Sequence, residues 1–359
     1  MNYDELLAPA AKFMRPSGIR KFFDLAAEMP HCISLGVGEP DFKTPWTIRD
    51  AGIRSLEQGR TRYTANAGIK ELRAEICRYL ARRMELNYQP SEVLVTVGGS
   101  EAIDLTIRAL VKPGDEVIIP EPCFVCYEPI TSLTGGVPVH IATKVEDDFR
   151  LRADQLRAAI TPRTKLLILP YPNNPTGRVL TRPEAEILRG FMLRHPDVVL
   201  LSDEMYEKIL YDGNENISPA SCADIAPRVV TVNGFSKCVA MTGWRIGYLA
   251  ASPEIVRVAG KLFQHTISCT SGFIQKAAAM AFECGEEIEA MRRTYQERRD
   301  FFVGGLNAVP GVHCELPEGA FYAWTKFDLP GMDSNQGGEY ILNNAKVVGV
   351  PGVSYGEEK

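Results

Sequence analysis

Short runs of β-branched and other apolar residues alternate with amphipathic stretches between about residue 90 and residue 250, and this pattern constrains the fold most strongly. Strands that are buried on both faces read as continuous apolar runs, and their alternation with helical segments is typical of a parallel sheet. The sequence therefore predicts an α/β fold in which a mostly parallel central sheet is wrapped by helices. The runs are VLVTV (93–97), EVIIP (116–120), KLLILP (165–170), VVLLSD (198–203) and VVTVN (229–233).

The regions around these runs predict helices and a second, smaller domain. After the first run, Ser100 can cap a helix whose apolar residues recur at i, i+4 and i+7. The charged stretch 286–300 predicts a helix that leaves the sheet, and HCELPEGAFYAWTKF (313–327) predicts β structure beyond it. The expected division is an N-terminal arm (1–15), a large domain (46–280) and a small α+β domain made of 16–45 together with 281–359.

Composition narrows the class of protein. A length of 359 residues with 45% hydrophobic content allows a large core and two domains. A net charge of −5 without long Lys/Arg runs argues against nucleic-acid and membrane surfaces, and favours small molecules or copies of the chain as partners.

The cysteines and the N-terminus indicate a compartment. Nine cysteines, an odd number, do not suit a disulfide framework and favour a reducing cytoplasm. The start MNYDELLAPAAKF lacks the apolar core of a signal peptide, and no segment reaches about 18 unbroken apolar residues. Cys123 and Cys126 form one Cys-x-x-Cys without a second pair, so no metal site is predicted. A soluble, cytoplasmic protein is expected.

Reactive side chains follow each predicted strand. In open parallel sheets, ligands bind at the carboxyl ends of the strands. Singly, each group has an ordinary structural explanation as a turn, a core aromatic, a helix cap or a surface lysine. Their coincidence at successive strand ends favours one crevice that suits a flat, phosphorylated, cationic heteroaromatic aldehyde. The groups are Gly98-Gly99-Ser100-Glu101, Phe124, Asn174, Asp203 with Tyr206, and Ser236-Lys237.

Several motifs resemble, in the same order along the chain, those of the class I/II aminotransferases of fold type I, which use pyridoxal 5′-phosphate. The segment GFSKCVAMTGWRIG (234–247) resembles the lysine-attachment motif of that family, with an arginine eight residues after the lysine. The resemblance covers about residue 17 to the end and implies a transferase of amino acid metabolism. The other motifs are SLGVGEPDFKTP (34–45), RYTANAGIKELR (62–73), YPNNPTG (171–177) and SDEMYEKI (202–209).

The resemblance implies catalytic roles for three residues. Lys237 would hold the cofactor through a Schiff base and then move a proton, which requires a neutral amine near pH 7. Asp203 would face the pyridine nitrogen and keep it protonated. Tyr206, with Asn174, would hydrogen-bond the cofactor's ring oxygen O3′, and Asn174 would also touch the substrate carboxylate.

Further contacts to the cofactor and the substrate follow from the same resemblance. Phe124 would stack on the ring, and Gly38 would line the pocket of the substrate's carboxylate. Tyr63 resembles a tyrosine that is lent to the neighbouring subunit's phosphate, which implies a homodimer with shared active sites. The phosphate itself would be bound by Gly99, Ser100, Glu101, Ser236 and Arg245.

The C-terminal end departs from the family's pattern. The family's carboxylate-binding arginine should follow a motif like PGVSYGEE (351–358), and the sequence ends at Lys359. Either the sequence is part of a longer protein with an incomplete small domain, or the carboxylate is held more weakly. Loss of such a bidentate bond costs about 1.5–3 kcal/mol, so weaker substrate affinity is expected for this chain.

Three functions remain open at this level. The first is an amino-acid transaminase that works by a ping-pong mechanism with 2-oxoglutarate as acceptor. The second is a carbon-sulfur β-lyase on the same scaffold, although such enzymes carry a His where this chain has Met205-Tyr206. The third is a ligand-sensing regulator, which the absence of a helix-turn-helix before residue 30 disfavours.

The preferred amino acid is not determined by the sequence. No arginine is identified that would reach a dicarboxylate, and aromatic or broad neutral amino acids are the expected donors. The aromatic residues expected near the mouth of the crevice, which could equally be core, are Phe22, Phe23, Phe321 and Tyr322.

Overall fold

The computed structural model describes residues 3–12, 14, 29 and 31–356. The α-helices are α1 (Tyr3–Leu6), α2 (Pro9–Lys12), α4 (Trp46–Glu57), α5 (Lys70–Met84), α6 (Gly99–Leu110), α7 (Tyr127–Leu133), α8 (Ala153–Ala159), α9 (Arg182–Arg194), α10 (Pro253–Thr266), α11 (Gly272–Ala279), α12 (Gly285–Asn307) and α13 (Ser334–Ala345). The strands are β1 (Ile33–Ser34), β2 (Val93–Thr96), β3 (Glu116–Glu121), β4 (Val137–Ala142), β5 (Thr164–Pro170), β6 (Val199–Asp203), β7 (Val229–Gly234), β8 (Gly247–Ala250), β9 (Val312–Cys314), β10 (Thr325–Phe327) and β11 (Val347–Val348).

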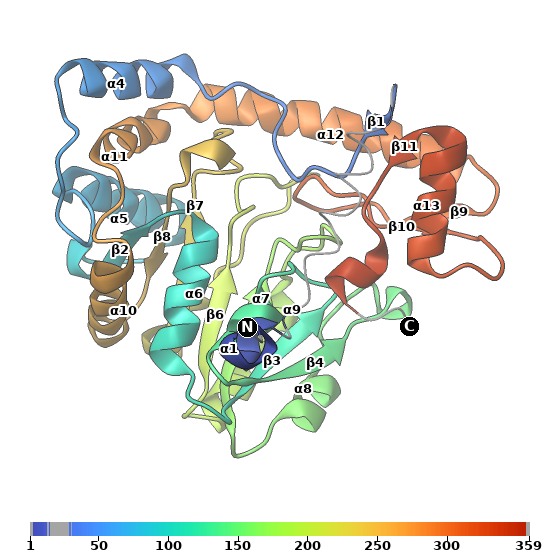
Figure 1. Cartoon of the computed structure of the whole chain (residues 1–359), viewed down its shortest axis with the longest axis horizontal. Helices are drawn as coiled ribbons and strands as arrows, with labels where there is room; N and C mark the ends of the chain where they lie inside the picture. Colours follow the sequence, from blue (N-terminus) through green and yellow to red (C-terminus); the bar gives the residue numbers. More distant parts are fainter. Residues whose placement is uncertain (1–2, 13, 15–28, 30, 357–359) are drawn as a thin grey trace.

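A central seven-stranded sheet has the order β2-β8-β7-β6-β5-β3-β4 (Figure 1). Strand β8 is antiparallel to both of its neighbours, whereas β3, β4, β5, β6 and β7 pair in parallel. The predicted α/β fold is therefore confirmed, and the five predicted runs correspond to β2, β3, β5, β6 and β7. Strands β4 and β8 were not among the predictions.

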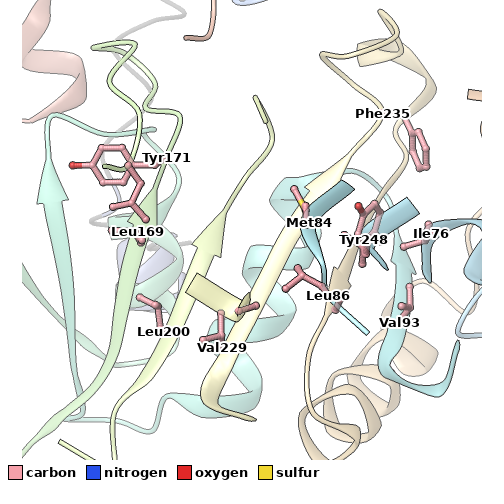
Figure 2. Close-up of a cluster of buried hydrophobic side chains, with 14 of the residues drawn as sticks. Ile76, Met84, Leu86, Val93, Leu169, Tyr171, Leu200, Val229, Phe235 and Tyr248 are labelled. Atoms are coloured by element: carbon pink, nitrogen blue, oxygen red, sulfur yellow. The ribbon is translucent and has the colours of Figure 1, made fainter. Parts of the chain in front are cut away.

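Both faces of the sheet are covered by helices, as the continuous apolar runs require. Along β6, Leu200 packs in one buried cluster and Leu201 in the other, because successive side chains point to opposite faces. The first cluster includes side chains of α5, α9 and α11, and Figure 2 shows part of it, from Ile76 and Val93 to Leu169 and Leu200. The second includes side chains of α6, α7 and α10.

The remaining elements lie beside the sheet. Helix α12 runs across the upper part of Figure 1 towards α13 and the hairpin of β9 and β10. The parallel pairing of β1 with β11 joins residues 33–34 to residues 347–348. The helix predicted at 286–300 is confirmed and is longer at both ends, and the predicted β structure after it is limited to β9 and β10.

The prediction that Ser100 caps a helix is wrong. Helix α6 begins at Gly99, its N-cap is Gly98, and no side chain caps it. The left-handed φ of 82° at Gly98 turns the chain sharply into the helix, so that Ser100 is already its second residue. The segment 17–26, with Phe22 and Phe23, lies outside the described residues. Among the helices of the described ranges, none combines the length and apolar composition needed to cross a bilayer.

Candidate active site

Three glycines bring the lysine loop and the start of α6 together. A Cβ atom at Gly234 would lie 2.9 Å from Cα of Gly247, and one at Gly247 would lie 2.8 Å from the carbonyl carbon of Gly98. The backbone at the end of β7, at the start of β8 and in the turn after β2 is therefore packed so closely that residues larger than glycine would not fit. Lys237, three residues beyond Gly234, consequently lies near the N-terminus of α6.

The Lys237 amine lies among a carbonyl group and aromatic rings. Its Nζ atom donates a hydrogen bond to the carbonyl oxygen of Gly38 at 2.5 Å. The same atom lies 5.6 Å from the ring centre of Phe321 and 5.9 Å from that of Tyr206. Gly38 lies against Tyr322, whose hydroxyl would be 2.9 Å from a Cβ at that position. The predicted residues Lys237, Gly38 and Tyr206 are thus brought together.

Burial lowers the pKa of Lys237 to about 8. The negative charges of Glu39 and Asp203 oppose this shift, whereas the positive charge of Arg245 adds to it. No carboxylate forms an ion pair with this amine in the described part of the chain. A substantial fraction of Lys237 is therefore neutral near physiological pH, as a nucleophilic or basic amine requires.

Asp203, at the end of β6, is a partly buried acid held in place by two donors. The Tyr127 hydroxyl donates to Oδ2 at 2.8 Å, and the Met205 amide donates to Oδ1 at 3.3 Å. Burial raises the pKa of the Asp203 carboxyl, and the hydrogen bonds from Tyr127 and Met205 and the charge of Lys237 only partly oppose the rise. An additional N–H donor beside Asp203 would stabilise the charged form of this acid.

Two consecutive asparagines after β5 have different roles. Asn173 Oδ1 accepts from both the amide and the hydroxyl of Thr176, each at 2.9 Å, and so builds the loop. Asn174 Oδ1 is buried and has no hydrogen-bond partner among the residues described. Since an unpaired buried acceptor is costly, Asn174 is the residue of this pair that is available to a ligand.

The N-terminus of α6 offers donors for an anion. The backbone amides of Gly99, Ser100 and Glu101 donate to no other group within the described ranges. The Arg245 guanidinium contacts the same turn, because its Nη2 would lie 2.7 Å from a Cβ at Gly98. Nη1 of Arg245 donates to a backbone carbonyl, and its guanidinium forms no ion pair in the described structure. Free amides at the positive end of a helix, beside an arginine, suit a phosphate group.

The other predicted residues border this arrangement. Ser236 is buried directly before Lys237, and Phe124 packs edge-on against the ring of Tyr127, with 6.0 Å between centres. The hydroxyl groups of Tyr206 and Tyr322 share a hydrogen bond of 2.5 Å. Tyr63 lies on the loop between α4 and α5 and is 89% exposed, so that it is not packed with the other predicted residues of its own chain.

Two residues of the site were missed or left undecided by sequence reasoning. Tyr127 was missed because no strand end marks it, although it lies only three residues after Phe124, and α7 begins with it. Tyr322 was left between core and pocket, and the structure places it against Gly38 and Tyr206. In the sequence, the aromatic pair at 321–322 marked Tyr322 as a candidate. Only the folding of β9 and β10 brings this pair to the sheet.

Comparison with known proteins gives consistent matches over nearly the whole chain. Residues 30–358 match the family described as aminotransferase class I and II. Aromatic-amino-acid aminotransferase 2 of Thermococcus litoralis is 40% identical over 98% of this chain and 91% of that protein. Aspartate aminotransferase of Pyrococcus abyssi is 40% identical over 96% of this chain and 89% of that protein.

Solved structures agree with these matches. The crystal structure of the aspartate aminotransferase from Rhizobium meliloti has a TM-score of 0.94 at 36% identity. The similarity covers 98% of this chain and 92% of that one. The shared fold therefore includes the sheet, both helical layers and the elements beside them.

Proposed function

Because the chain belongs to the class I and II aminotransferases, we propose that it moves the amino group of an L-amino acid to a 2-oxo acid at the cleft around Lys237. Transamination is the activity of its relatives, and this decides against the β-lyase and regulator alternatives. The observation that supports the site most strongly is the convergence of a partly neutral lysine, a partly buried acid and an anion-binding turn.

The residues of the cleft fit pyridoxal 5′-phosphate, the cofactor that this family generally uses. In the described part of the chain, the amides at the start of α6 are unengaged beside an arginine without an ion pair, which suits a phosphate, and the Asn174 side chain keeps a group without a partner. Among the described residues, Asp203 accepts hydrogen bonds from the Tyr127 hydroxyl and the Met205 amide, and a protonated ring nitrogen would add a cationic donor. The residues that would hold the cofactor are Gly99, Ser100, Glu101, Phe124, Asn174, Asp203, Tyr206, Ser236, Lys237 and Arg245, with Tyr63 from a second subunit.

Each residue then has a defined task. When bound, the cofactor supplies an aldehyde that takes up the amino group and a ring that accepts electrons from the substrate. The Nζ atom of Lys237 moves the proton at the substrate's Cα, because its neutral form is populated near pH 8. Asp203 holds the ring nitrogen protonated, and Tyr127 fixes the orientation of that carboxylate. Tyr206 and Asn174 orient the ring oxygen, and the Asn174 amide and the Gly38 backbone bind the substrate carboxylate.

We propose 2-oxoglutarate as acceptor and aspartate or an aromatic amino acid as donor. Relatives named for both kinds of donor match nearly the whole chain at the same identity, which supports these two classes. A donor panel of aspartate, phenylalanine, tyrosine and alanine, with 2-oxoglutarate and added cofactor, should give glutamate from at least one of the first three. Absence of amino transfer from every donor would refute the proposal, and Lys237→Ala provides the inactive control.

A dimer completes the proposed phosphate site. Tyr63 is 89% exposed on a loop that Asn66 ties to the Ser268 carbonyl through a 2.6 Å hydrogen bond, which favours a contact outside its own chain. Two such loops exchanged between subunits would give shared active sites. Light scattering that finds a fully active monomer would contradict this arrangement.

The proposed domain division follows the pairing of the outer strands. Parallel contact of β1 with β11 supports a small domain made of residues 16–45 and 281–359, packed beside a large domain of residues 46–280, with 1–15 as an arm. The nine cysteines are free thiols, which supports a cytoplasmic site of action. Fractionation that recovers the protein outside the cytoplasm would contradict the latter.

A further inference from the structure

The segment from Pro317 to Ala320 touches two parts of the candidate active site. On one side, the amides of Glu318 and Gly319 both donate to the carbonyl oxygen of Gly177, at 3.0 Å and 2.8 Å. Gly177 closes the loop that carries Asn174, since its own amide donates to the Asn173 carbonyl at 3.0 Å. The segment therefore lies directly against the asparagine loop.

On its other side, the same segment holds the turn that follows Tyr206. The Tyr211 amide donates to the carbonyl of Glu318 at 3.0 Å, and the Ala320 amide donates to that of Ile209 at 2.8 Å. The Ile209 amide in turn donates to the Tyr206 carbonyl at 2.8 Å. A short stretch of backbone thus sets the distance between the loop of Asn174 and the turn of Tyr206.

The side chain of Glu318 adds a contact that backbone bonds alone do not make. Its Oε2 accepts from the Val179 amide at 3.1 Å, and its Oε1 accepts from Arg150 Nη2 at 2.6 Å. Arg150 Nη1 donates to the Val179 carbonyl at 2.7 Å. The carboxylate and the guanidinium therefore bind both polar groups of Val179, five residues after Asn174, and fix the chain as it leaves the loop.

The ion pair between Arg150 and Glu318 is partly shielded from solvent. The side chains of Arg150 and Glu318 are 21% and 24% exposed, so solvent screens them less than a surface pair. Glu315, three residues earlier, carries the same charge but is 41% exposed, and among the described residues its ion pairs are with Arg178, at 3.7 Å, and its neighbour His313. Glu315 makes no hydrogen bond to the loop from Asn173 to Gly177, which makes it a matched control.

We infer that Glu318 is a positioning residue, which acts through Val179 and Gly177 to hold Asn174 at the distance from Tyr206 that binding of the substrate carboxylate requires. This role rests on the proposed function. Removing the carboxylate leaves the cleft's own groups intact but frees the exit of the asparagine loop. The consequence is weaker binding of the substrate, with a smaller effect on the proton transfer at Lys237.

Steady-state kinetics of Glu318→Ala, Glu315→Ala and Asn174→Ala, with the double variant of Asn174 and Glu318, test this inference. In Glu318→Ala we expect KM to rise roughly tenfold, as for loss of a charge-assisted hydrogen bond, with kcat changed less than about threefold. Glu315→Ala should match the parent chain. The double variant should be no worse than Asn174→Ala, because coupled residues are not additive.

Amide hydrogen exchange supplies a readout that does not depend on activity. The Val179 amide should exchange several-fold faster in Glu318→Ala than in Glu315→Ala, and Glu318→Gln serves if the alanine variant does not fold. Equal kinetics and exchange in the two alanine variants, or an additive double variant, would overturn the inference. A parent chain that neither binds cofactor nor transfers amino groups would instead count against the proposed function, and the exchange comparison would still be readable.

Discussion

Asp203 and Glu204 are consecutive carboxylates at the end of β6, yet they belong to two different regions of the molecule. Asp203 faces the cleft with Tyr127 and Lys237. Glu204 points to the other side, where Ser202 donates to its Oε1 at 2.8 Å, Ser218 donates to the same atom at 2.6 Å, and Asn216 donates to Oε2 at 2.9 Å.

The surroundings of the two acids distinguish a carboxylate of the candidate active site from a structural one. Burial raises the pKa of both acids, and the chain supplies donors to both oxygens of each, so the two carboxylates differ in what surrounds them. In the candidate active site, the acceptor of Asn174 and the amides at the start of α6 have no partner in the described structure. Burial of an acid alone is therefore a poor mark of an active site, whereas unengaged backbone amides at a helix N-terminus beside such an acid indicate an anionic ligand.

The largest expected effect is on turnover. Asp203→Asn should lower kcat by roughly 10²–10³-fold, because an amide supplies no negative charge to the ring nitrogen. Glu204→Gln makes the same chemical change, from carboxylate to amide, at the adjacent position and should alter kcat less than about threefold. The comparison requires kcat of both variants at saturating cofactor, with the cofactor content of each protein measured by absorbance. Similar losses in both variants would remove the distinction between the two regions.

A smaller effect concerns stability. Burial raises the pKa of Glu204 to about 7 from an ordinary value of 4.5, so the folded state binds this proton more tightly than the unfolded state. Its contribution to stability is therefore full below pH 4.5 and is lost as the pH rises through 7, by roughly 3 kcal/mol.

Urea unfolding of the parent chain and of Glu204→Gln between pH 4.5 and pH 8 measures this contribution. The free energy of unfolding of the parent chain should fall with rising pH relative to that of the variant, which cannot ionise at this position. Parallel pH profiles for the two proteins would show that Glu204 does not titrate in this window.

Much of the sheet and of the cleft follows from local sequence. Runs that are apolar on both faces predicted five strands, and the rule that ligands bind at their carboxyl ends predicted a common site for Asp203 and Lys237, whose charges interact in the structure. Strand β8 was missed because GYLA is short and antiparallel, and its place depends on glycine contacts with Gly98 and Gly234. Such contacts have no signature in a single segment.

Contacts between distant segments explain the other gaps. Tyr127 and Asp203 are 76 residues apart, and Tyr206 and Tyr322 are 116 apart, so their pairing requires the tertiary fold. The different roles of Asn173 and Asn174 depend on which side chain the turn to Thr176 uses. The assumed cap at Ser100 failed because the positive φ of Gly98 starts the helix two residues earlier.

Identification of the residue that binds the cofactor tests the central claim most directly. Protein loaded with pyridoxal 5′-phosphate, reduced with borohydride and digested, should yield one labelled peptide per chain, and mass spectrometry should locate the label on Lys237. Absorbance near 400 nm should disappear on reduction and be absent in Lys237→Ala. A label on another lysine, or no uptake of the cofactor at all, would contradict the account.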